Sequence, residues 1–178
     1  MKEGRKIKKQ WIIIVAIAVL TVLAVFQSST PTGNKEELPK EGYKAPQISL
    51  NGLDGKTYSF ESLNGKPVII NFWASWCGPC KTEAPDLVRT YEKYSKQIEI
   101  YAVNITAVDS LDEAKAFVAE YGFSFPVLLD LDGSVTQRYQ VKPIPTTFFV
   151  NGKGIITDQV IGAVDPQDME RKIKRLIK

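Results

Sequence analysis

The sequence predicts an α/β domain in which a mixed central sheet has helices on both faces. Apolar runs of strand length alternate with segments of helical period between residues 67 and 150. A pair of short strands precedes this alternation, and a hairpin with a final helix follows it. The chain of 178 residues, 44% hydrophobic and 24% charged, has room for one such domain and an appendage.

The first predicted elements surround the two cysteines of the chain. Residues 47–60 contain two short strands around Asn-Gly and Asp-Gly pairs, which tolerate a positive φ. Residues 67–73, PVIINFW, form a continuous apolar run that is typical of a strand covered on both faces. A helix should follow the cysteines, and Pro85 inside it should bend it. Its core-facing side chains recur at helical spacing: Leu87, Val88, Tyr91 and Tyr94.

The next part of the chain predicts a segment of helix inserted between two strands. Residues 98–105 and 125–130 are the strands, and residues 110–122 between them are the helix. We expect Ser110 to cap this helix, with Glu113 completing a reciprocal capping box and Gly122 ending the helix.

The C-terminal part predicts a short helix, a hairpin and a final helix. Residues 132–141 read as a turn with a short helix, and residues 146–150 and 154–161 as a hairpin joined by Asn-Gly-Lys-Gly. Asp165 should cap the last helix, with Pro166 in its first turn. The buried stripe of this helix is expected to be Met169, Ile173, Leu176 and Ile177.

The N-terminal residues predict a membrane anchor. Residues 1–10 contain five basic residues and one acidic residue, and residues 11–26 are uncharged. A helix over 11–26 would be roughly 24 Å long, and flanking residues extend it toward the roughly 30 Å of a bilayer core. We therefore predict a cytoplasmic basic segment (1–10), a transmembrane signal-anchor (11–28), a flexible tether (29–44) and an extracytoplasmic domain (45–178).

A cleaved signal peptide is the main alternative to the anchor. The apolar run slightly exceeds the usual signal-peptide core, and AVFQSST is a poor cleavage site, so we favour the uncleaved, single-pass anchor in the cell membrane. A buried core helix is a second alternative, disfavoured because the segment has no amphipathic face.

Charge and composition exclude some classes of function. Residues 11–178 carry 18 basic and 19 acidic side chains without a basic stripe, so we expect no nucleic-acid binding. The chain has no histidine, and therefore no imidazole that could act as a base, an acid or a metal ligand.

The two cysteines, Cys77 and Cys80, predict a redox pair. A zinc site or an iron-sulfur cluster needs more thiolate or imidazole ligands than this chain has, so we expect no metal. A structural disulfide is also disfavoured, because a loop of two residues restricts the unfolded chain little. Cys77 falls where a strand ends and a helix begins, and the helix dipole there lowers a thiol pKa.

The residues around the pair fit the same interpretation. We expect Cys80, one turn into the helix, to be more buried and less reactive than Cys77. Pro79 should hold the first turn in helical geometry, and Gly78 should leave the approach to Cys77 open.

FWASWCGPC, Pro85 five residues past the second cysteine, and the distant IPTTFFV together resemble thioredoxin-fold proteins. More narrowly, residues 45–178 resemble the membrane-anchored thiol-disulfide oxidoreductases of the ResA/TlpA type, which share the anchor, the N-terminal hairpin and the inserted strand and helix. The resemblance implies that Cys77 is the nucleophile, that Cys80 is the resolving thiol and that Pro145 is the cis-proline of the fold. It also implies a substrate-binding surface, composed of Trp76, Gly78, Pro79, Ile144 and Pro145.

The chain departs from cytoplasmic thioredoxins at Asn71 and from many ResA-like proteins between the two cysteines. Asn71 stands where cytoplasmic thioredoxins have a buried aspartate, and Glu83 matches an acidic residue that ResA-like proteins place near the cysteines. We expect Glu83 to tune the thiol pKa values and to shuttle a proton when Cys80 attacks; a solvated helix glutamate is the alternative. Gly-Pro replaces the frequent Glu-Pro between the cysteines, which leaves the redox potential and the substrate open.

The resemblance implies a monomeric reductant of protein disulfides that needs no cofactor beyond the Cys77-Cys80 pair. Apocytochrome c is the implied acceptor and a membrane thiol carrier of the CcdA type the implied donor; reduction of spore-envelope proteins is an alternative. A thioredoxin-like peroxidase is another, although no Pro-x-x-x-Thr-x-x-Cys pattern precedes Cys77. A copper chaperone of the same fold would require a CxxxC spacing and a distal histidine, and this chain has neither. An adhesive domain is the remaining alternative.

Overall fold

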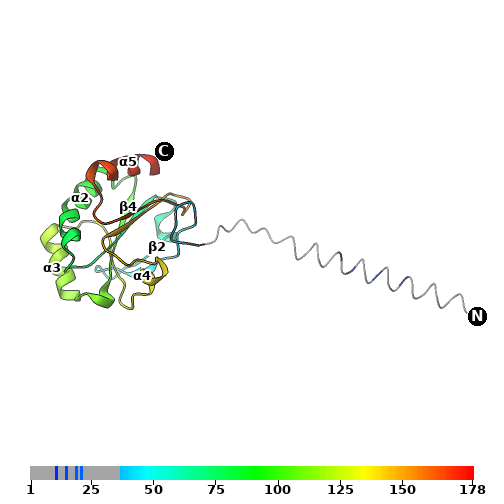
Figure 1. The fold of residues 1–178 in the computed structure, drawn as a ribbon, viewed down its shortest axis with the longest axis horizontal. Helices are drawn as coiled ribbons and strands as arrows, with labels where there is room; N and C mark the ends of the chain where they lie inside the picture. Colours follow the sequence, from blue (N-terminus) through cyan, green and yellow to red (C-terminus); the bar gives the residue numbers. More distant parts are fainter. Residues whose placement is uncertain (1–10, 12–14, 16–18, 20, 22–36) are drawn as a thin grey trace, which may run out of the picture. The chain divides into compact units, whose positions relative to one another are not determined.

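The computed structural model describes residues 37–178 together with Trp11, Val15, Val19 and Thr21 (Figure 1). The predicted basic segment, most of the predicted anchor and residues 29–36 of the predicted tether lie outside this description. Over the residues that are described, no helix is both long enough and apolar enough to cross a membrane.

Strands and helices alternate through residues 49–178 in the predicted order. The strands are β1 (Ser49–Asn51), β2 (Thr57–Ser59), β3 (Val68–Trp73), β4 (Glu99–Asn104), β5 (Val127–Leu129), β6 (Thr146–Val150) and β7 (Ile156–Ile161). The α-helices are α2 (Gly78–Tyr94), α3 (Leu111–Tyr121), α4 (Ser134–Arg138) and α5 (Pro166–Leu176). Short 3₁₀ helices occur at η1 (Glu61–Leu63) and η2 (Thr106–Val108).

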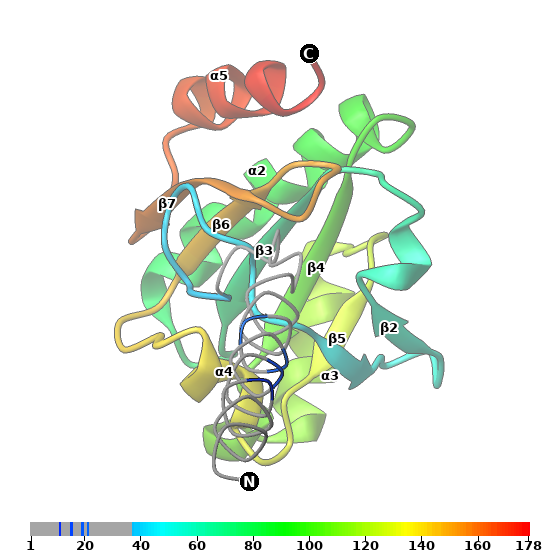
Figure 2. The same ribbon diagram turned by 90° about the vertical axis from the view of Figure 1, so that its right-hand side faces the viewer.

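The central sheet is mixed, as predicted. Its strand order is β5-β4-β3-β6-β7 (Figure 2). Strands β3, β4 and β5 are parallel, whereas β6 is antiparallel to both β3 and β7. The carboxyl ends of β3, β4, β5 and β7 therefore lie at one edge of the sheet, because β7 runs in the same direction as β3.

Side chains of successive strand residues enter two different cores. Ile69 of β3 packs with α2, α3 and α5, whereas Ile70 packs with α4 and with the residues around β1 and β2. In β6, Phe149 belongs to the same core as Ile69, and Phe148 belongs to the same core as Ile70. Helices thus cover both faces of the sheet, as predicted, and every residue of β3 is buried.

The last residues of the predicted tether belong to the folded domain. The Gly42 N–H donates to the Ile156 carbonyl at 2.8 Å, and the Ile156 N–H donates to the Tyr43 carbonyl at 3.0 Å. Lys44 forms an antiparallel bridge with Ile155. Residues 42–44, which the sequence places in the tether, therefore pair through their backbone with the residues at the start of β7.

The helix ends follow their sequence signals with one exception. The Ser110 hydroxyl accepts from the Glu113 N–H at 3.5 Å, and Gly122 ends α3 with a φ of 69°. The reciprocal half of the predicted capping box is wrong, because the Ser110 N–H donates to the Asp109 carboxylate at 2.9 Å. Asp165 caps α5 as predicted, accepting from two backbone N–H groups of its first turn.

Gly152, in the turn between β6 and β7, is expected to be intolerant of any side chain. A Cβ atom at this position would collide with the Gly65 carbonyl oxygen, and a backbone atom cannot move aside as a flexible side chain can. We expect Gly152→Ala to lower the free energy of unfolding by about 1–3 kcal/mol. Chemical denaturation measures this, with Lys153→Ala in the same turn as the control. An unchanged midpoint would show that the two backbones separate at little cost.

Candidate active site

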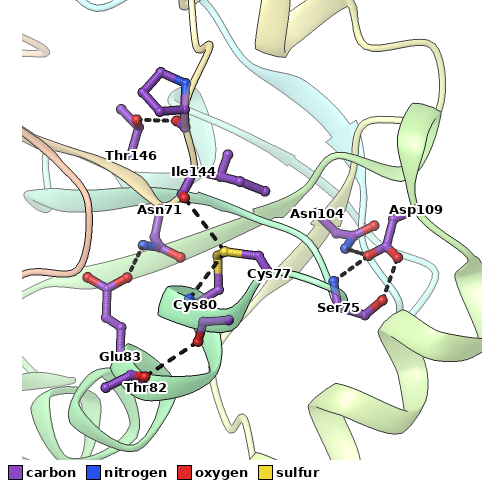
Figure 3. Close-up of a disulfide and its surroundings, with 12 residues drawn as sticks. Asn71, Ser75, Cys77, Cys80, Thr82, Glu83, Asn104, Asp109, Ile144 and Thr146 are labelled. Carbon is purple, nitrogen blue, oxygen red and sulfur yellow. Dashed lines mark hydrogen bonds between the residues drawn. A yellow bond between two sulfur atoms is a disulfide. The ribbon is translucent and has the colours of Figure 1, made fainter.

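The two cysteines lie at the junction between β3 and α2 and are joined by a disulfide bond (Figure 3). Cys77 is the N-cap of α2, and its Sγ accepts from the Cys80 N–H at 3.2 Å. Pro79 occupies the first turn, where its missing N–H removes no helical hydrogen bond. The Cys77 sulfur therefore faces the positive end of the helix dipole, which stabilises a thiolate at this position.

The expectation that Cys80 is more buried than Cys77 is wrong in this disulfide form. Cys77 is 3% exposed and Cys80 is 4% exposed. The Ile144 carbonyl oxygen lies 3.6 Å from the Cys77 Sγ and covers it on one side (Figure 3). Gly78 is exposed, and a Cβ added to it would touch nothing, so the chain next to Cys77 is open to solvent although Cys77 itself is buried.

The loop before β6 completes the surroundings of the disulfide. The Ile144-Pro145 peptide bond is cis, as the resemblance implies. The Pro145 carbonyl accepts from the Gly162 N–H at 2.8 Å, which ties this loop to the end of β7. Of these two carbonyl groups it is therefore that of Ile144 that faces the reactive sulfur.

Glu83 is a buried side chain on α2, not a solvated one. It is 2% exposed. One carboxylate oxygen accepts from the Asn71 Nδ2 at 3.1 Å and the other from the Val164 N–H at 3.0 Å (Figure 3 shows the bond to Asn71). The alternative of a solvated helix glutamate is thereby excluded.

Burial also changes the acidity of this group. The pKa of Glu83 is raised to about 7, because desolvation disfavours the charged form more than the hydrogen bonds from Val164 and Asn71 favour it. Glu83 therefore exchanges its proton near neutral pH, which is the range in which a general acid or base on a thiol exchange reaction is useful.

Asn71 of β3 links the Glu83 carboxyl group to the adjacent strand β6. Its Nδ2 donates both to Glu83 and to the Thr147 Oγ1, the latter at 2.9 Å. Asn71 and Thr147 are direct partners in the β3–β6 pairing, so the sheet itself sets their separation. Sequence reasoning found Asn71 but missed Thr147 and Val164. The Val164 contribution has no sequence signal, because it is a backbone N–H.

A second polar cluster that sequence reasoning missed supports the loop before Cys77. The Asp109 carboxylate accepts from the Ser75 N–H at 2.7 Å, the Ser75 hydroxyl at 2.5 Å and the Asn104 Nδ2 at 2.7 Å (Figure 3). Asp109 follows η2, in the segment between β4 and α3. The inserted segment thus fixes the position of the loop that leads from β3 to Cys77.

The two tryptophans of the motif have different surroundings. Trp73 is 1% exposed and packs on Phe117 of α3, with ring centroids 4.6 Å apart. Trp76 is 60% exposed, and its Nε1 donates to the Val108 carbonyl at 3.1 Å. Trp73 is therefore a core residue, and Trp76 presents an apolar ring to solvent beside Cys77.

Comparison with known proteins agrees with this geometry. The model of the AhpC/TSA family matches residues 42–159. The thiol-disulfide oxidoreductase ResA of Bacillus subtilis (strain 168) is 37% identical over 154 residues, covering 86% of this chain and 81% of that protein. The thioredoxin-like protein YneN of the same organism is 32% identical over 166 residues, covering 93% and 97%.

A solved structure shows the same fold. The DsbE-type thiol:disulfide interchange protein of Chlorobium tepidum superposes with a TM-score of 0.72 at 32% identity, covering 78% of this chain and 99% of that one. Fold, paired cysteines and relatives agree. The chain belongs to the AhpC/TSA family and is a thiol-disulfide oxidoreductase of the ResA type.

Proposed function

We propose that this oxidoreductase works as a reductant of protein disulfides outside the cytoplasm. The observation that carries the proposal is the buried Glu83 on the helix of the two cysteines, with a pKa of about 7. A dithiol that reduces a substrate loses two protons as its disulfide forms, and a neighbouring group that titrates near neutral pH can accept one of them.

The proposed reaction has two steps. The Cys77 thiolate attacks one sulfur of a substrate disulfide, so that an S–S bond forms between enzyme and substrate and the first substrate thiolate leaves. Glu83 then takes the proton of the Cys80 thiol, and the Cys80 thiolate attacks the Cys77 sulfur. The second substrate thiolate leaves, the enzyme holds the Cys77–Cys80 disulfide, and two electrons have passed to the substrate.

Trp76, Gly78, Pro79, Ile144 and Pro145 are proposed to contact the substrate during this exchange. Trp76, Gly78 and Pro79 are exposed around Cys77, and the Ile144 carbonyl faces the same sulfur. The chemistry needs the cysteine pair alone, without a bound cofactor. Cysteine pairs on the enzyme and on its partners carry all of the electrons.

Membrane attachment and the partners are part of the same proposal. The uncharged residues 11–26 and the basic residues before them favour a single-pass anchor with the domain on the extracytoplasmic side. A reductant there must be reduced again across the membrane, which calls for a thiol carrier of the CcdA type. As the acceptor we propose apocytochrome c, which the resemblance to ResA/TlpA-type proteins implies, for a monomeric enzyme in cytochrome c maturation.

The test is reduction of oxidised apocytochrome c by the pre-reduced full-length protein. We expect free CxxCH thiols to appear. We also expect apocytochrome c to oxidise the reduced enzyme faster than hydrogen peroxide does. Faster oxidation by peroxide would instead assign a peroxidase. Capture of partners by a Cys80→Ala variant in cells identifies the acceptor, and capture of spore-envelope proteins without apocytochrome c would contradict the proposed pathway.

A further inference from the structure

Exposed basic side chains gather on the C-terminal helix and on the turn before β7. Residues 171–178 contain five basic residues and no acidic one. Four of these five are exposed, and so is Lys153 in the turn between β6 and β7. We call the five exposed residues the basic face: Lys153, Arg171, Lys174, Arg175 and Lys178.

The residues of the basic face form one continuous surface. Three of them line a groove of about 630 Å³, four line a second hollow, and Arg175 and Lys178 belong to both. The groove also contains Pro67, which directly precedes β3. Because the cysteines follow β3, the groove and the disulfide lie at opposite ends of this strand, whose six residues span roughly 20 Å.

The acidic side chains beside the basic face do not neutralise it. Asp158, Asp168 and Glu170 each contact two basic side chains, so these ion pairs involve five basic residues. With Lys153 and Lys178 the region has seven basic side chains against three acidic ones.

The charge of the domain is therefore unevenly distributed. Residues 37–178 carry 17 basic and 18 acidic side chains in all, so the rest of the domain has ten basic and 15 acidic ones. The near-neutral total of the sequence conceals this arrangement. An anionic surface would attract the basic face and repel the remainder of the domain.

The surroundings of the basic face favour lipid headgroups over a protein partner. Protein interfaces bury a core of apolar side chains. Among residues 37–178, none of the large apolar side chains that are exposed lines the groove or the second hollow. Lys and Arg side chains are attracted to the phosphate groups of an anionic bilayer without inserting into it. The groove is also large enough to admit a single headgroup.

We propose that the basic face docks on anionic phospholipid headgroups of the membrane that holds the anchor. The proposed anchor ends at residue 28, and the eight residues between it and Glu37 reach at most about 29 Å. The tether therefore keeps the domain within reach of the headgroups. The inference rests on the proposed anchor and adds the orientation of the domain on the membrane.

The proposed orientation turns the disulfide away from the bilayer. Cys77 then faces the disulfides of proteins in solution, because it lies at the end of β3 opposite the groove. Exchange with a thiol carrier inside the membrane would call for release of the basic face. Docking and release thus separate the two partners of the enzyme.

The test measures how close two positions of the full-length protein lie to headgroups in nanodiscs. Gln97→Cys lies in the groove, and Asp132→Cys is exposed after β5, at the disulfide end. Each is labelled with a fluorophore while Cys77 and Cys80 remain oxidised, and lipids with a spin-labelled headgroup quench the fluorophore at short range. With roughly 30% phosphatidylglycerol, we expect severalfold more quenching at position 97 than at position 132. In pure phosphatidylcholine, or at high salt, this difference should disappear.

Two triple variants with the same labels locate the attraction. The variant of the basic face is Lys153→Gln/Lys174→Gln/Lys178→Gln. The matched control removes three exposed charges elsewhere and is Lys56→Gln/Lys115→Gln/Arg138→Gln. Arg175 is retained because it donates to the buried Asp158. We expect the first variant to lose at least fivefold of the quenching at position 97 and the control to retain it.

Two further measurements accompany the variants. A melting temperature verifies that each one folds. The rate at which each one reduces a soluble disulfide peptide should equal that of the wild type, because none of the changed residues lies at the cysteine pair. This rate tests the proposed function independently of the docking.

Each contrary result is distinct. Quenching at position 97 that responds neither to phosphatidylglycerol nor to salt would overturn the docking, since the tether alone would then set the distance. Equal quenching at both positions would show adsorption without orientation, and an equal loss in both triple variants would show attraction by total charge; either result contradicts the basic face. Failure of the full-length protein to insert into nanodiscs would refute the anchor and this inference together. Absence of peptide reduction would refute only the proposed function.

Discussion

Replacing Cys77 by alanine is expected to lower the rate of protein-disulfide reduction by about 1000-fold or more, because the variant has lost its nucleophile. Cys77 has the sulfur that caps α2 and faces the Ile144 carbonyl, so Cys80 cannot take over its position. The insulin reduction assay measures the effect. Full activity of the Cys77→Ala variant would contradict the assignment.

Cys80→Ala is the companion of this variant and separates the two roles. It retains the attacking thiol but cannot resolve the intermediate, so a mixed disulfide between Cys77 and the substrate is expected to accumulate. Mass spectrometry without reductant detects it as the summed mass of the two chains. A double variant that lacks both cysteines is the control for nonspecific association. If only Cys77→Ala trapped the substrate, the two roles would have to be exchanged.

Glu83→Gln is expected to remove a large pH dependence of stability. The pKa of Glu83 is about 7 in the folded protein, against an ordinary value of 4.5. Between these values the folded state binds more protons than the unfolded state, so stability falls as pH rises through this window. The difference corresponds to about 3 kcal/mol. The free energy of unfolding of Glu83→Gln, relative to that of the wild type, should therefore rise by about 3 kcal/mol between pH 4 and pH 8.

Chemical denaturation of the oxidised protein at both pH values measures this gain. Glu92→Gln, at an exposed position of the same helix, is the matched control and should show no such gain. The pH dependence of alkylation of the reduced protein is the second measurement. We expect Glu83→Gln to shift the titration of the Cys80 thiol, and unchanged profiles of both thiols would exclude Glu83 as their proton acceptor.

Much of the domain could be predicted because its signals are local. The apolar run of β3, the Asp165 cap and the Gly122 stop each act within a few residues, and each stands where the sequence indicates. Residues 42–44 lie in a stretch without a hydrophobic period, and they join the fold through backbone pairing with the start of β7. Pairing of this kind leaves no pattern in side-chain identity, so it could not be predicted from the sequence.

The residues of the site that could be predicted from the sequence are those that lie close together in one motif. Cys77, Cys80 and Glu83 lie at the start of one helix; the spacing of the two cysteines predicted the redox pair, and a resemblance added Glu83. Asp109 was missed because its partner Ser75 is 34 residues away and lies on another loop. The burial of Cys77 was missed for the same reason, since the group that covers it comes from Ile144, 67 residues further on.

The pairing of β6 with β3 has a consequence for how the active site is assembled. Asn71 opposes Thr147, and Val68 opposes Val150 at the far end of the same pair. A slip of one residue would turn Thr147 to the opposite face and displace Ile144 along Cys77. The tight turn after β6 lies at the end of the molecule opposite the disulfide. An insertion or deletion there would shift β7 against β6, and would thus displace Gly162 from the Pro145 carbonyl without changing the identity of any residue near the cysteines.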